Sequence, residues 1–173
     1  VDLAARVARG VGRRAADDEA RRALGARRSS VFTTPPRAAL AASTHAEGSA
    51  LSRAATGSGM SQQAFGLRHK IFEVEAWLSS APCPVVEVHP EVSFAAMLGA
   101  PATAPKKSWQ GMVERYRALS AVGLFLDEAT GEGCLRASVD DMLDAGAAAW
   151  TSRRVRDGVA YSLPSEPPVV AGR

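Results

Sequence analysis

The sequence predicts an α/β fold that is mostly helical over its 173 residues. Most of the chain shows helix signals, namely capping residues and apolar side chains at helical spacing. One segment, Val85–His89, is instead β-branched and lies between prolines, which is typical of a short strand. Because one strand cannot form a sheet, we expect its partner strands to lie in sequence before Val1. The fold is therefore expected to be incomplete in this chain.

Composition narrows the classes of protein that the chain could represent. Its 173 residues are enough for one domain or two small ones, and 46% of them are apolar. No uncharged run is long enough for a transmembrane helix, so we expect no membrane span. Cys83 and Cys134 stand apart without CxxC spacing, which favours reduced thiols and a cytoplasmic location over a disulfide scaffold.

Basic residues gather near the beginning of the chain, although the net charge is only +3. Residues 1–37 carry nine Arg against four acidic residues. A basic segment of this kind could meet phosphate groups, or it could be an Arg-rich helix with a solvated face. Nucleic acid is therefore a possible partner, while the sequence gives no indication of oligomeric state.

Four helices are expected in the first half of the chain. Gly25 should end the first, because Gly readily adopts the left-handed conformation that follows a helix. Ser61 should cap the last, and the segment 27–32 is expected to be an ordered loop. The expected helical ranges are 13–24, 36–42, 44–55 and 61–78.

Three helices are expected after the strand, over 91–98, 109–121 and 139–156. Gly123 should stop the second of them. Ser138 and Asp141 match the capping-box pattern in its weaker Asp form, and arginines at 153, 154 and 156 suit the negative end of the helix dipole. The Pro-rich tail, 163–173, is expected to be loose.

Acidic residues are the best candidates for chemistry. Glu87 shares a face of the expected strand with His89, where it could face solvent or point into a site. Asp141 and Asp144 share one face of the last helix, although Asp141 could simply cap that helix. Asp144 precedes a stripe of small residues, 146–149, which would let the helix lie close against a sheet. Hard cations such as Mg²⁺ and Mn²⁺ prefer carboxylate oxygens, so these positions suit a metal site.

Other catalytic motifs are absent from the sequence. It has no phosphate-binding loop with a GK[ST] end, no G-x-S-x-G elbow and no G-x-G-x-x-G. The three histidines have no ligand spacing. Lys106 and Lys107 precede an expected helix, where they could contact phosphate or belong to a solvated loop.

Several motifs occur in an order that resembles a known family. They include RRSSVF at 27–32, EVHPEVSF at 87–94, KKSWQG at 106–111 and DDMLDA at 140–145. In this respect the sequence resembles the predicted RNase-H-like nuclease family (domain-of-unknown-function family 429). The match spans nearly the whole chain.

The resemblance implies an RNase-H-like α/β fold whose first strands are missing from this chain. The partial domain would cover residues 1–162, with a large helical insertion at about 13–79. It also implies a set of metal-binding and catalytic acids, with Mg or Mn as the cofactor, and these are Asp2, Glu87 and Asp144, with Asp141 as a further ligand. The substrate-binding residues it implies are Arg28, Ser30, Lys70, Glu91 and Lys107.

Three functions remain open from the sequence. The first is a metal-dependent nuclease, in which the acids hold the metal and the basic side chains position phosphate. The second is a non-catalytic module that binds nucleic acid or protein. The third is an enzyme that acts on a small phosphorylated substrate, with the helical insertion roofing its site. For the nuclease, this stretch of chain alone is expected to be inactive if a missing strand carries a required ligand.

Overall fold

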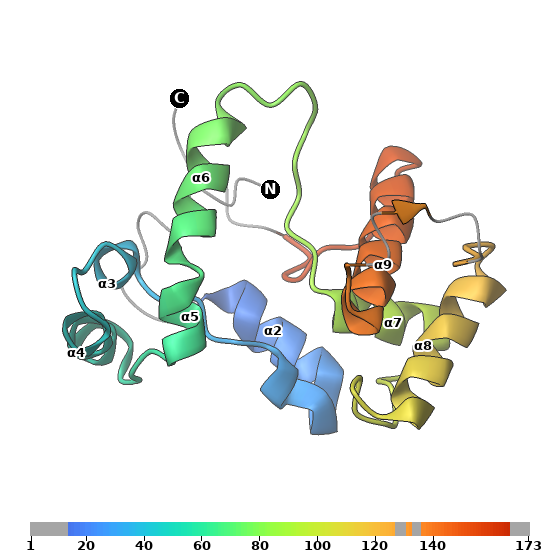
Figure 1. The fold of residues 1–173 in the computed structure, drawn as a ribbon, viewed down its shortest axis with the longest axis horizontal. Coiled ribbons are helices and arrows are strands. Elements are labelled where there is room, and N and C mark those ends of the chain that lie inside the picture. Colours follow the sequence, from blue (N-terminus) through green and yellow to red (C-terminus); the bar gives the residue numbers. More distant parts are fainter. Residues whose placement is uncertain (1–13, 127–130, 133–135, 167–173) are drawn as a thin grey trace. The chain divides into compact units, whose positions relative to one another are not determined.

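The computed structural model describes residues 14–126, 131–132 and 136–166 (Figure 1). The chain divides into two compact units: unit 1 comprises Val1–Glu19, Phe32–Glu87 and Leu163–Arg173, and unit 2 comprises Ala20–Val31 and Val88–Ser162. Within the described residues both units are built from helices, and these residues form no strand. None of the described helices has the length and apolar character needed to cross a membrane.

Unit 1 is organised around a small apolar core formed by α3 (Arg37–Leu40), α4 (His45–Thr56) and α5 (Gln62–Gly66). The α6 helix (Arg68–Leu78) packs on this core through Ile71 and Phe72. α3 and α4 approach closely because Gly48 has no side chain, since a Cβ there would lie 2.6 Å from the carbonyl oxygen of Ala39. The buried core residues are Ala39, Leu40, Ala42, Met60 and Phe65.

Unit 2 packs α7 (Pro90–Leu98), α8 (Trp109–Ala121) and α9 (Val139–Arg156) around a second core. A Cβ on Gly146 would lie 2.8 Å from a methyl group of Leu119, so this glycine lets α9 lie close to α8. The small-residue stripe after Asp144 thus packs on a helix in the described structure, and not on the sheet that the sequence predicted. The buried core residues are Phe94, Ala118, Leu119, Leu143 and Ala147.

Most helices lie where the sequence predicted them. α2 (Ala15–Leu24) ends before Gly25, whose φ of 51° is left-handed, and the short 3₁₀ helix η1 (Gly25–Ser30) follows. Thr44 caps α4 by accepting a hydrogen bond from the amide of Glu47 at 3.2 Å. α8 and α9 match their predicted bounds. Local capping signals therefore determine where these helices begin and end.

The strand predicted over Val85–His89 is wrong for the described structure. This segment is irregular and leads directly into α7 at Pro90. A β-branched run becomes a strand only when a neighbouring strand exchanges hydrogen bonds with it, and the described residues contain none.

Three smaller expectations also need correction. The single helix predicted over 61–78 is two helices, α5 and α6, which are separated at Leu67 just after the helix-weakening Gly66. The loop predicted at 27–32 is largely the 3₁₀ helix η1. At the start of α9, the hydroxyl of Ser138 accepts from the amide of Asp141 at 3.3 Å, which is the serine half of the predicted capping box, but the carboxylate of Asp141 contacts that hydroxyl at 2.7 Å and not the amide of Ser138. Asp is one methylene shorter than the Glu of the usual motif.

Gly111 lies where the first turn of α8 meets the preceding loop. A Cβ at this position would lie 2.0 Å from the carbonyl oxygen of Pro105 and 3.0 Å from that of Ala104. Both contacts are with backbone, so neither neighbour can turn aside as a side chain could. Ser108 fixes the same turn, because its hydroxyl donates to Pro105 O at 2.7 Å and accepts from the amide of Gly111 at 3.1 Å.

Gly111→Ala should therefore destabilise the protein by about 2–3 kcal/mol, since the methyl group forces the loop away from α8. Gly66→Ala is the matched control, because a Cβ there meets nothing within 4 Å. Ala in place of this helical Gly should stabilise by up to about 1 kcal/mol. Urea unfolding followed by circular dichroism measures both changes. Wild-type stability in Gly111→Ala would contradict the close approach of the loop.

Candidate functional site

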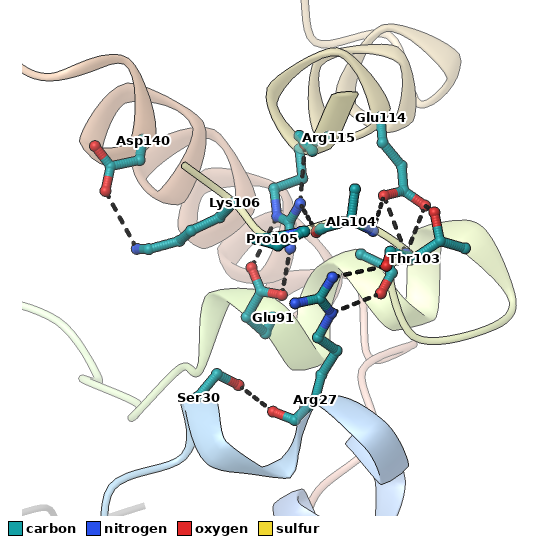
Figure 2. A network of polar contacts seen from close by, with 12 residues as sticks. Arg27, Ser30, Glu91, Thr103, Ala104, Pro105, Lys106, Glu114, Arg115 and Asp140 are labelled. Carbon is teal, nitrogen blue, oxygen red and sulfur yellow. Dashed lines mark hydrogen bonds and ion pairs between the residues drawn. The ribbon is translucent and has the colours of Figure 1, made fainter. Parts of the chain in front are cut away.

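Unit 2 contains a network of polar contacts around the segment between α7 and α8, residues 99–108, which we call the Lys106 loop (Figure 2). Glu114, on α8, binds the middle of this loop. Its carboxylate accepts hydrogen bonds from the Thr103 amide at 2.9 and 3.1 Å, from the Thr103 hydroxyl at 3.1 Å and from the Ala104 amide at 3.2 Å. One side chain thus fixes two successive backbone N–H groups.

Arg115 holds the same loop from the buried face of α8. Its guanidinium is only 1% exposed and donates to both carboxylate oxygens of Glu91, at 2.8 and 2.5 Å. It also donates to the carbonyl oxygens of Ala104 at 3.2 Å and Gly111 at 2.9 Å. The ion pair links α7 to α8, and the contact with Ala104 joins the loop to α8, whereas the contact with Gly111 lies within α8.

Arg27, on η1, holds the loop from a third direction. Its Nε donates to the carbonyl oxygen of Ala102 at 3.1 Å, and its Nη2 donates to that of Thr103 at 2.7 Å. Figure 2 shows Arg27 and Glu114 meeting at Thr103. The peptide groups that precede Lys106 are therefore fixed by side chains from η1 and α8.

Lys106 extends from this loop to α9. Its Nζ lies 2.8 Å from Oδ2 of Asp144 and 3.6 Å from Oδ2 of Asp140. The two carboxylates are one helical turn apart, so they share a face of α9 and converge on the same ammonium. The second oxygen of Asp144, Oδ1, is buried and has no hydrogen-bond partner. This arrangement is the candidate site.

Electrostatics favours the charged forms of Lys106 and Asp140. Burial lowers the pKa of Lys106, but the hydrogen bond and negative charge of Asp144 outweigh it, so the pKa is raised overall. The pKa of Asp140 is lowered, chiefly by the hydrogen bond from Ser138 and further by the charge of Lys106. The site therefore combines a protonated amine with ionised carboxylate.

The predicted acids take different places in the structure. Glu87 belongs to unit 1, where both of its carboxylate oxygens accept hydrogen bonds from Arg14. Glu91 belongs to unit 2, and both of its carboxylate oxygens accept hydrogen bonds from the buried guanidinium of Arg115. Asp141 is exposed and bonded to Ser138. Asp2 lies outside the described residues.

The predicted phosphate contacts are mostly exposed. Arg28 and Lys107 are exposed in unit 2, and Lys70 is exposed on α6 of unit 1. Ser30 is half-buried, and its hydroxyl donates to the carbonyl oxygen of Arg27 at 2.8 Å. Lys107 alone among these residues belongs to the Lys106 loop.

A complete metal centre is not formed by the parts of the chain that the structure describes. Within them, no three His, Cys, Asp or Glu side chains come together as a ligand group. Asp144 does meet a second carboxylate, but this belongs to Asp140 and not to the predicted Asp141. The hydroxyl of Ser138 lies 2.6 Å from Oδ1 of Asp140 and 2.7 Å from Oδ2 of Asp141, so the two differ in their contact with Lys106, which only Asp140 makes.

Sequence reasoning did not assign the residues that hold the Lys106 loop: Arg27, Glu114 and Arg115. One signal was available for Arg115. Positions 111, 115, 118 and 119 form one face of the predicted helix, and an arginine within an otherwise small and apolar face indicates a buried partner. The identity of that partner depends on how α7 packs, which has no local signature.

Unit 2 is thus a helical unit in which a rigid loop presents a lysine to two carboxylates. The chain belongs to the family described as "Protein of unknown function (DUF429)", whose model matches residues 1–169. No curated protein and no solved structure matches the chain.

The Glu114 contacts predict a specific pH dependence of stability. Burial would raise the pKa of Glu114, but hydrogen bonds from Thr103 and Ala104 outweigh it and lower the pKa. A carboxyl group whose pKa is lower in the folded protein stabilises the fold above its unfolded pKa of about 4.3. That contribution is lost as the pH falls through the folded pKa.

We therefore expect the stability difference between wild type and Glu114→Gln to shrink as the pH is lowered from 7 to 3. Urea midpoints at a series of pH values measure this difference. Glu73→Gln is the matched control, because Glu73 is exposed on α6 and should change little at any pH. A stability difference for Glu114→Gln that does not vary with pH would contradict the role of its ionised carboxylate.

Proposed function

We propose that the chain is a metal-dependent nuclease domain that hydrolyses phosphodiester bonds, with Asp144 and Asp140 holding Mg²⁺ or Mn²⁺. The observation that carries this proposal is the convergence of both carboxylates on one cationic atom, Nζ of Lys106. The resemblance of the sequence to RNase-H-like nucleases, which carry a metal-binding acid on the last helix, supports the role of Asp144.

The residues present fit such an ion. Mg²⁺ in phosphate-processing sites is typically held by one or two carboxylates, with water and phosphate oxygens completing its shell. Oδ1 of Asp144 is buried without a hydrogen-bond partner, so its lone pairs are available to a cation. When bound, the ion would lower the pKa of a coordinated water and neutralise charge on the phosphate. Asp2 and Glu87 stay predictions as further ligands.

The chain's own residues would orient and neutralise the substrate. Lys106 holds Asp140 and Asp144 toward one point, and its raised pKa keeps its ammonium protonated. Beside a phosphodiester, that ammonium would donate a hydrogen bond to a phosphate oxygen and stabilise the negative charge that develops there. The contacts of Arg115 and Glu114 fix the loop, so the backbone that carries Lys106 is in place before the substrate binds.

A non-catalytic module that binds nucleic acid is the second candidate, and one observation favours it. Each of three predicted site acids is paired with a basic side chain, because Glu87 meets Arg14, Glu91 meets Arg115 and Asp144 meets Lys106. Ion pairs within the fold account for these carboxylates without a metal. In that case binding would weaken with salt but would not require a divalent ion.

Asp144→Asn should abolish cleavage of single-stranded or double-stranded DNA, RNA or hybrids in Mn²⁺, because the variant loses a charged metal ligand. The assay uses the longest natural protein that contains this sequence, and EDTA should also abolish cleavage. Asp157→Asn is the matched control, since Asp157 lies just after α9 and pairs with the exposed Arg156. Circular dichroism verifies that both variants are folded.

Undiminished cleavage by folded Asp144→Asn would contradict the assignment of Asp144. Salt-sensitive binding that persists in EDTA, without cleavage of any polymer in Mn²⁺, would favour the binding module.

A further inference from the structure

α8 has two faces of opposite character. Its buried face carries Arg115 and the small or apolar residues that pack in unit 2. The opposite face carries Trp109, Val113 and Tyr116, whose spacing of four and three residues places them in one stripe. Trp109 is 77% exposed and Tyr116 is 43% exposed. Val113 between them is half-buried, and large exposed aromatic side chains on one helix face are candidates for a binding surface.

Positive charges flank this stripe. Lys107 immediately precedes α8, and Arg117 follows Tyr116 directly in the chain. Both side chains are exposed, and neither forms a salt bridge within the part of the chain that the structure describes. The single acidic residue of α8, Glu114, is bound to the Lys106 loop. The surface therefore combines aromatic rings with cations.

We propose that this surface, which we call the Trp109 stripe (Trp109, Val113 and Tyr116, with Lys107 and Arg117), binds single-stranded nucleic acid. Bases stack on the two aromatic rings, and phosphates meet the two cations. Unpaired bases expose their faces to such rings, whereas a duplex hides them between neighbouring base pairs.

The spacing of the rings agrees with this ligand. Tyr116 follows Trp109 by seven positions, which is about 10.5 Å along a helix axis. This distance equals about three steps of 3.4 Å between stacked bases. A short single strand can therefore reach both rings. The exposed cations on either side of the rings also favour a polyanion over an apolar protein surface, because a protein partner would have to cover Lys107 and Arg117.

The position of the stripe also indicates a substrate class for the proposed nuclease. This part of the inference rests on the proposed function. Trp109 follows Lys106 by only three residues, at the point where the Lys106 loop enters α8. A strand on the stripe would pass the end of α8 from which Lys106 reaches Asp144. The inferred substrate class of the nuclease is therefore single-stranded nucleic acid.

Fluorescence anisotropy of a labelled single-stranded oligothymidylate, titrated with the protein in EDTA, tests the proposal apart from cleavage. Trp109→Ala should weaken binding by about 5- to 150-fold, which corresponds to the usual range for removal of one stacking residue. Trp109→Phe should retain most of the affinity, because it keeps a ring. Trp77→Ala is the matched control, since Trp77 is 46% exposed but lies on α6 of unit 1. It should bind as wild type does.

The salt dependence of the affinity measures the contribution of Lys107 and Arg117. Lys107→Ala removes one phosphate contact and should reduce the slope of log affinity against log salt by about 0.7. Arg117→Ala should act in the same way. Because all four side chains of these variants are exposed, the changes should leave folding intact, which circular dichroism verifies.

Three outcomes would overturn the proposal: wild-type affinity in Trp109→Ala, equal binding of a duplex of the same sequence, or no binding of the oligonucleotide. Self-association that depends on Trp109, and that the oligonucleotide does not displace, would instead assign the stripe to a second copy of the chain. If the surface binds nucleic acid but the proposed nuclease function is wrong, a different result is expected. Binding in EDTA would then depend on Trp109 as expected, while no polymer is cleaved in Mn²⁺.

Discussion

The buried guanidinium of Arg115 is the constraint on which unit 2 depends. A charge that is withdrawn from water is tolerated only when it is paired and its N–H groups are bonded. Arg115 meets this requirement with the carboxylate of Glu91 and the carbonyl oxygens of Ala104 and Gly111. Each partner comes from a different part of unit 2, namely α7, the Lys106 loop and α8 itself. Satisfying one charge therefore fixes the arrangement of all three.

The site at the end of this loop is held differently from the loop itself. The Lys106 side chain is 37% exposed and that of Asp144 is 24% exposed. Such partly solvated ion pairs contribute at most about 1 kcal/mol to stability, so another cation or an anion can replace either partner at little cost. The rigid scaffold and the exchangeable pair have separate roles. The first positions the amine and the carboxylates, and the second would let them bind a ligand under the proposed function.

Local signals explain why most of the fold could be predicted. Thr44, Ser138 and Gly25 mark helix ends by chemistry that acts within a few residues, and the structure has helix boundaries at each. The predicted strand failed because strand formation requires a partner, which the composition of Val85–His89 cannot supply. The candidate site was predictable only in part. Asp144 was identified from its place on the last helix, whereas the choice of Asp140 over Asp141 depends on where the side chain of Lys106 reaches α9.

The proposed function requires that Asp140 and Asp144 form one cation site for which Lys106 competes. Titration of the chain with Mn²⁺, with free ion followed by its electron paramagnetic resonance signal, tests it directly in wild type, Asp144→Asn and Lys106→Gln. We expect Asp144→Asn to weaken Mn²⁺ binding and Lys106→Gln to strengthen it, because removal of the ammonium frees both carboxylates. Unchanged affinity in Asp144→Asn, or weaker binding in Lys106→Gln, would contradict the account.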